Sequence, residues 1–84
     1  MTTARDAALK AAEWATTADS EAATADDSRT KAAEFGRKPF NTDMVARHRT
    51  DAEQADARQQ RAIAAATMWA AVSGALLATE EPTR

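Results

Sequence analysis

The 84-residue sequence contains no cysteine and a single histidine, and both absences restrict its chemistry. Without cysteine the chain forms no disulfide and no thiolate metal site, which fits a reducing compartment. His48 alone cannot hold a metal ion, and Val45 stands where a di-iron bundle would place a glutamate three residues earlier. Asp51 could orient His48 as a base, but no nucleophile or oxyanion loop accompanies the pair. We therefore expect no metal, no cofactor and no enzymatic activity, and a structural role for His48.

Glycine and proline are also scarce, with two of each in the chain. Neither occurs between Thr3 and Phe35, and Thr3 with Asp6 has the spacing of a capping box. This predicts a first helix over about 4–35. Apolar or small residues then recur at helical spacing from Thr42 onward, which predicts a second helix over about 42–79.

The stretch 36–41 predicts a turn between the two helices. Gly36 suits the left-handed position that commonly follows a helix C-terminus. Asn41 can cap the second helix, and Phe40 and Val45 flank it at the spacing of a hydrophobic staple. We expect a single all-α domain over 1–84, an antiparallel hairpin.

A seven-residue pattern predicts how the two helices face each other. Small residues occupy the first helix at Ala4, Ala11, Ala18, Ala25 and Ala32, with Ala7, Trp14, Glu21, Ser28 and Phe35 three residues after each. The matching positions of the second helix are Val45, His48, Ala52, Ala55, Gln59, Ala62, Ala66, Trp69, Ser73 and Leu76. When the helices fold together, Glu21 falls at the level of Arg58, Gln59 and Arg61 and forms with them a polar layer that can fix the register.

The core available to such a hairpin is thin, because the chain has 24 alanines and only 13 larger apolar residues. Association with another chain is the usual remedy for a small scaffold without disulfides or metals. The apolar half of the second helix is too wide for one partner helix, so we expect a homo-oligomer, most simply a dimer forming a four-helix bundle. The expected interface residues are Ile63, Ala66, Trp69, Ala70, Gly74, Leu76 and Leu77.

The same apolar half permits a membrane interpretation. The segment 62–79 has no charged residue and is flanked by Arg61 and Glu80. Its length of about 27 Å is slightly short for a hydrocarbon layer of about 30 Å. A small-residue row of the kind that lets membrane helices touch is formed by Ala66, Ala70, Gly74 and Ala78. A small membrane-associated protein with a marginal span is therefore an alternative.

Charge is distributed unevenly along the chain, whose net charge is −2. The segment 29–49 carries a net charge of +4, so the remainder carries −6. This gives a second alternative, in which the basic tip of the hairpin binds an anionic partner such as nucleic acid, with Phe35 and Phe40 offering rings that could stack on bases. The candidate residues are Arg37, Lys38, Arg47 and Arg49. Cations at this place are also favoured by the dipole of the first helix, without any ligand.

The main expectation is thus a non-enzymatic helical module that assembles with itself or with a protein partner. No apolar run follows the charged residues of the first six positions, so we expect no secretory signal and a cytoplasmic location. The segment 80–84 contains Pro82 and is expected to fray.

Overall fold

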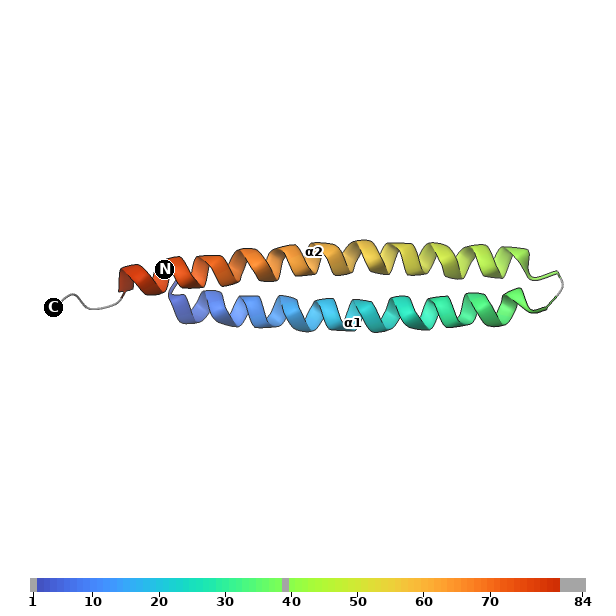
Figure 1. Ribbon diagram of the computed structural model, residues 1–84, viewed down its shortest axis with the longest axis horizontal. Coiled ribbons are helices and arrows are strands. Elements are labelled where there is room, and N and C mark those ends of the chain that lie inside the picture. Colours follow the sequence, from blue (N-terminus) through green and yellow to red (C-terminus); the bar gives the residue numbers. More distant parts are fainter. Residues whose placement is uncertain (1, 39, 81–84) are drawn as a thin grey trace.

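Two long helices packed side by side make up the structure (Figure 1). The computed structural model describes residues 2–38 and 40–80. Helix α1 spans Ala4–Gly36 and helix α2 spans Thr42–Glu80, and the two run antiparallel in a rod with Cα extents of 72 × 15 × 13 Å. The predicted all-α hairpin is confirmed, and each helix ends one residue later than predicted.

Helix α1 begins at the capping box that the sequence predicts. The Thr3 hydroxyl accepts a hydrogen bond from the Asp6 amide at 3.2 Å, and the Asp6 carboxylate accepts one from the Thr3 amide at 3.2 Å. The bond from the Thr3 backbone lowers the pKa of Asp6, because it favours the ionised carboxylate. Two of the free amides at the helix start are satisfied in this way.

The end of α1 differs from the prediction. Gly36 is the last residue of the helix and does not adopt a left-handed conformation. Arg37 caps the helix instead with φ −82° and ψ −12°, and its amide donates to the Glu34 carbonyl at 3.3 Å. The chain therefore leaves α1 through a right-handed turn, for which glycine is not required.

The left-handed conformation falls on Phe40, whose φ is 68°. For a bulky side chain this backbone geometry is strained. The Phe40 side chain is 100% exposed, so the predicted staple between Phe40 and Val45 is wrong. The Val45 amide donates to the Asn41 carbonyl at 3.0 Å, which places Asn41 just before α2 as predicted. Pro39, which belongs to the predicted turn, lies outside the described residues.

The heptad positions predicted for the seam contain every buried residue of the described chain. These are Ala4, Ala7, Ala18, Ala25, Ser28 and Ala32 in α1, and Ala52, Ala55 and Ala62 in α2. Alanine lets the two backbones approach closely but contributes little apolar area. Among the described residues no large side chain is fully buried.

Polar and aromatic contacts hold the two helices in register along their length. Near the turn, the Phe35 and His48 rings stack with centroids 5.3 Å apart, which agrees with a structural role for His48. At mid-length the Arg58 guanidinium donates to the Glu21 carboxylate at 2.9 Å, so the predicted polar layer forms with one of its three candidate partners.

Two hydrogen bonds close the open end of the hairpin, and both involve Ala4. The Ser73 hydroxyl donates to the Ala4 carbonyl at 2.9 Å, and the Ala4 amide donates to the Glu80 carboxylate at 2.8 Å. Glu80 thus belongs to α2 and places a negative charge at the α1 N-terminus, where the helix dipole favours it. This corrects the expectation that fraying begins at residue 80. Residues 81–84 lie outside the described part.

Candidate association face

The larger apolar side chains of this hairpin lie mainly outside the seam. Leu9, Ile63, Met68 and Leu77 are 54%, 41%, 51% and 60% exposed, whereas the buried positions hold alanine and one serine. Trp14 occupies a seam position but is still 40% exposed. Apolar area is therefore left for another surface to cover.

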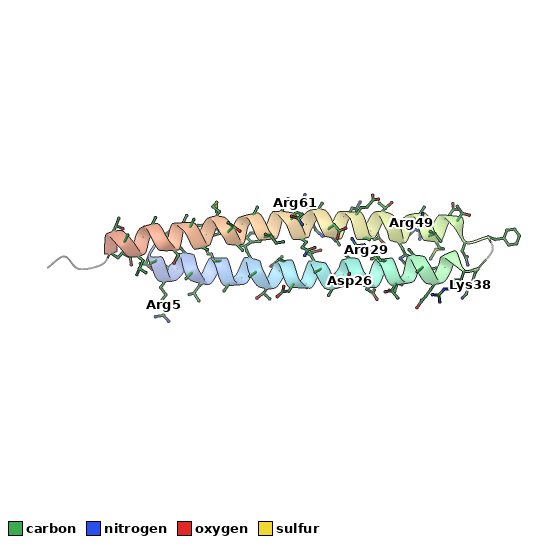
Figure 2. All side chains as sticks on the ribbon, in the orientation of Figure 1. Arg5, Asp26, Arg29, Lys38, Arg49 and Arg61 are labelled. Carbon is green, nitrogen blue, oxygen red and sulfur yellow. The ribbon has the colours of Figure 1, made fainter. Side chains whose placement is uncertain are left out.

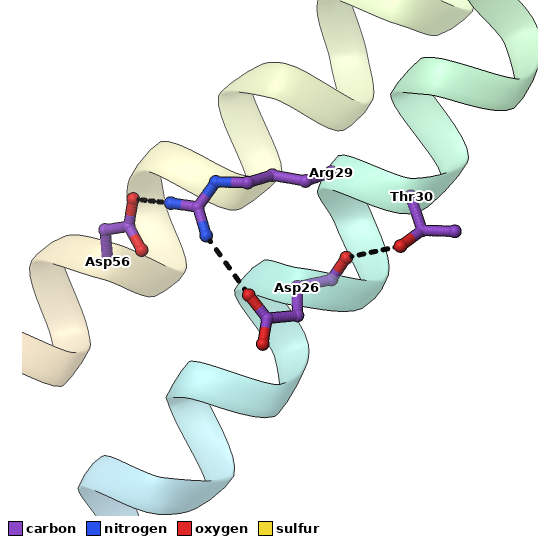
Figure 3. A network of polar contacts seen from close by, with 4 residues as sticks. All are labelled: Asp26, Arg29, Thr30 and Asp56. Carbon is purple, nitrogen blue, oxygen red and sulfur yellow. Dashed lines mark hydrogen bonds and ion pairs between the residues drawn. The ribbon is translucent and has the colours of Figure 1, made fainter.

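A network around Arg29 identifies one side of the hairpin (Figure 3). The Arg29 guanidinium pairs with Asp56 across the seam and lies 3.5 Å from the Asp26 carboxylate on its own helix. The Thr30 hydroxyl donates to the Asp26 carbonyl at 3.0 Å. The hydrogen bond with Asp56 raises the pKa of Arg29, because it stabilises the charged guanidinium.

Residues spaced by seven lie on the same side of a supercoiled helix. Residues at this spacing from Arg29 and Asp56 therefore lie on the side of the ion pair, and they extend toward the open end of the hairpin. From Arg29 the steps reach Ala22, Ala15 and Ala8, and from Asp56 they reach Ile63, Ala70 and Leu77. We call these six residues the open-end face. Ala22 is half-buried and the other five are exposed. The face contains no charge, although it continues directly from a charged pair.

The structure divides the interface residues predicted from the sequence into two groups. Ala66, Trp69 and Leu76 are half-buried at seam positions, and the Lys10 ammonium lies 5.2 Å from the centre of the Trp69 ring. Ile63, Ala70, Gly74 and Leu77 are exposed. A Cβ atom built on Gly74 would meet no atom within 4 Å. The exposed group is therefore the part of the predicted set that is free to meet a partner.

Helix α2 is also long and apolar enough to cross a membrane by length and composition. Its most apolar 18-residue window has a mean hydropathy of 1.6, and 6% of that window is buried. This is weak evidence for insertion, since core helices of soluble proteins and signal sequences meet the same criterion. The low buried share shows that α1 covers only a narrow stripe of the apolar half of α2.

The four cations predicted at the tip are all exposed, and they are Arg37, Lys38, Arg47 and Arg49. Figure 2 shows Lys38 at the turn. None of them forms an ion pair within residues 2–38 and 40–80, whereas Arg29, Lys31 and Arg58 each have an acidic partner. The exposed ring of Phe40 joins them at the tip. The sequence left two roles open for Phe40, a stacking ring at the basic tip or a packing contact with Val45, and its exposure excludes the second.

The described part of the hairpin has a groove between the helices and another at the turn. A groove of about 310 Å³ lies between the helices at Arg29, Arg49, Glu53 and Asp56, where opposite charges face each other. Within the described part of the chain, no group of three or more potential ligands could hold a metal ion.

No family model, curated protein or solved structure matches the chain. Its function must therefore be inferred from its own surface.

Proposed function

We propose that this protein is a non-enzymatic assembly module whose hairpin pairs with a second copy through the open-end face to form a four-helix bundle. The observation that supports this most strongly is that small side chains are buried in the seam while large apolar side chains are exposed on the surface. The seam buries alanines, while Ile63 and Leu77 remain 41% and 60% exposed on a side without charge. A soluble protein rarely leaves such a face uncovered.

The contacts at the open end favour a bundle over membrane insertion. For α2 to enter a bilayer alone, the Ser73 hydroxyl and the Glu80 carboxylate would have to leave Ala4. If the hairpin instead entered the bilayer as far as its mid-length, Glu21 would be exposed to hydrocarbon or would lose its bond to Arg58. Pairing with a second hairpin keeps all these contacts and covers the same apolar residues.

Thermal unfolding at different protein concentrations tests this proposal. Because a dimer links folding to association, the melting temperature should rise over a roughly hundredfold increase in protein concentration. Added vesicles should leave the melting curve unchanged. A melting temperature independent of concentration would contradict self-association, and salt-resistant flotation with vesicles would favour the membrane alternative.

A second candidate function, binding of single-stranded nucleic acid at the tip, is favoured by one observation. Phe40 is fully exposed in a strained backbone conformation beside four cations without acidic partners. A free aromatic ring can stack on a base while cations bind the phosphates. The fully exposed Phe40 ring contributes little packing to the fold, and backbone strain at such a position points to a function.

Two variants test the tip. Arg37→Glu with Lys38→Glu should abolish oligonucleotide binding, and the binding of the parent should fall steeply with salt. Phe40→Gly should weaken binding yet raise the free energy of unfolding by about 1 kcal/mol, because glycine accepts a positive φ without strain. Arg61→Glu, an exposed change on the shaft (Figure 2), is the charge control. If the parent protein does not bind a short oligonucleotide at low salt, nucleic-acid binding at the tip is excluded as a function.

A further inference from the structure

We infer that the groove at the turn is a nucleotide subsite, in which one base of a single strand stacks on Phe40 while Lys38 and Arg49 bind the adjoining phosphates. This inference rests on the second candidate function, binding of single-stranded nucleic acid at the tip, and specifies where it takes place. It does not depend on self-association. It follows from the lining of the groove, from its charge, and from the position of Arg49.

The groove at the turn has the size and the mixed lining of a small-ligand site. Its volume of about 370 Å³ lies at the low end of the range of about 300–1,000 Å³ for such sites. Phe35 and Val45 contribute apolar surface, and Asn41 and Thr42 contribute an amide and a hydroxyl group. A nucleotide base has apolar faces and hydrogen-bonding edges, so a single base matches this lining.

The charge of the lining favours a phosphate as part of the ligand. Lys38 after α1 and Arg49 on α2 both line the groove, and no carboxylate from residues 2–38 and 40–80 lines it with them. Glu34 and Asp43 are exposed near the tip but lie outside the lining. The groove between the helices also has two arginines, but two carboxylates balance them. Of the two grooves, the one at the turn is therefore the one suited to an anion.

Of the two aromatic rings that line the groove, Phe40 is the one free to stack on a base. The Phe35 ring already stacks on His48 with centroids 5.3 Å apart, and the Lys38 ammonium lies 6.0 Å from the centre of the Phe35 ring. The Phe40 ring is 100% exposed. A base can thus stack on Phe40 while Lys38, placed near Phe35, binds the adjoining phosphate.

The position of Arg49 limits the length of strand that the tip can bind. Arg49 lines both grooves, and beyond it the groove between the helices contains Glu53 and Asp56, which repel phosphates. We therefore expect affinity for oligothymidylates to stop rising at about four nucleotides, the low end of known single-strand site sizes. A further rise of more than about tenfold between four and sixteen nucleotides would contradict a site confined to this groove.

Glutamine variants test the groove with a matched control. At about 50 mM salt, Arg49→Gln should weaken binding of an oligothymidylate by about fivefold, because one phosphate contact is lost. The slope of log affinity against log salt should also become shallower by about 0.7. Arg47→Gln, two residues earlier on α2, removes the same charge from an exposed residue outside the lining. It should change the affinity by less than about twofold.

Equal effects of the two glutamine variants would overturn the inference. They would show that the charge of the tip acts without a defined groove, while binding of nucleic acid itself would stand. If the parent binds no oligothymidylate at low salt, the candidate function fails and the subsite with it. Circular dichroism checks that each variant remains helical.

Competition experiments test for the base. Thymidine 5′-monophosphate should displace the oligothymidylate at least about fivefold more effectively than inorganic phosphate, because a stacked base adds to the phosphate contact. With Phe40→Gly the two competitors should become equal. Equal competition on the parent protein would overturn the base subsite. If vesicles of anionic phospholipid bind the tip and the nucleotide does not release them, the partner is a lipid surface and the inference is wrong.

Discussion

Gly74→Leu should weaken self-association by about 1–3 kcal/mol, on the order of ten- to hundredfold, while stabilising the single hairpin. A Cβ atom at Gly74 meets no atom within 4 Å, so leucine has room on the single hairpin. Replacing glycine inside a helix also gains about 1 kcal/mol of helix propensity. In the proposed dimer, however, Gly74 borders the open-end face one helical turn after Ala70, and leucine at this position would force the two hairpins apart.

The matched control for this change is Ala71→Leu, one residue before Val72 on an exposed side of the same helix. It adds similar apolar area but points away from the open-end face. Dissociation constants of both variants should be measured by sedimentation, and the hairpin's own stability by melting at low concentration. If Gly74→Leu assembles as tightly as the parent and Ala71→Leu weakens assembly, the face has been assigned wrongly.

Ala55→Leu should destabilise the hairpin itself by about 1–3 kcal/mol, because the site is overpacked by the larger side chain. Ala55 is 0% exposed and lies on the seam next to Asp56, which pairs with Arg29. Separating the helices there would also weaken that ion pair. The expected result is a lower urea midpoint and a lower melting temperature at every protein concentration.

Ala57→Leu serves as the control for the core variant. Ala57 lies two residues further along α2 and is exposed, so the change should alter stability by at most about 0.5 kcal/mol. Equal losses in the two variants would show that leucine disturbs the helix rather than the seam, and would contradict the alanine core described above.

The features that could be predicted from the sequence are those that depend on helical periodicity. The alanine seam follows from seven-residue spacing, which fixes one side of each helix. The capping box of Thr3 and Asp6 depends on contacts within one turn. The polar layer at Glu21 follows once two helices of similar length are joined by a short turn, and the structure selects Arg58 as the partner from Arg58, Gln59 and Arg61.

The turn could not be predicted in the same way, because its backbone must connect two helices that are already packed. Gly36 is the residue best suited to a positive φ, yet the conformation falls on Phe40. The preference of glycine for a positive φ was overridden by the path that the chain must take to connect the two packed helices. The staple expected between Phe40 and Val45 was lost for the same reason.

The division of the predicted interface residues also required the structure, because the sequence assigned Ala66, Trp69 and Leu76 both to the seam and to the interface. Burial along α2 and the ion pair between Arg29 and Asp56 show which heptad row lies beside the seam. That row places Ala70 on the exposed side, while Trp69 packs toward α1 with Lys10 beside its ring.

Sedimentation equilibrium of the unmodified chain in aqueous buffer is the most direct test of the central claim. The account predicts a reversible association to about twice the chain mass of 9.0 kDa at micromolar concentration, without detergent. A species of 9.0 kDa that stays monomeric and melts cooperatively would contradict it.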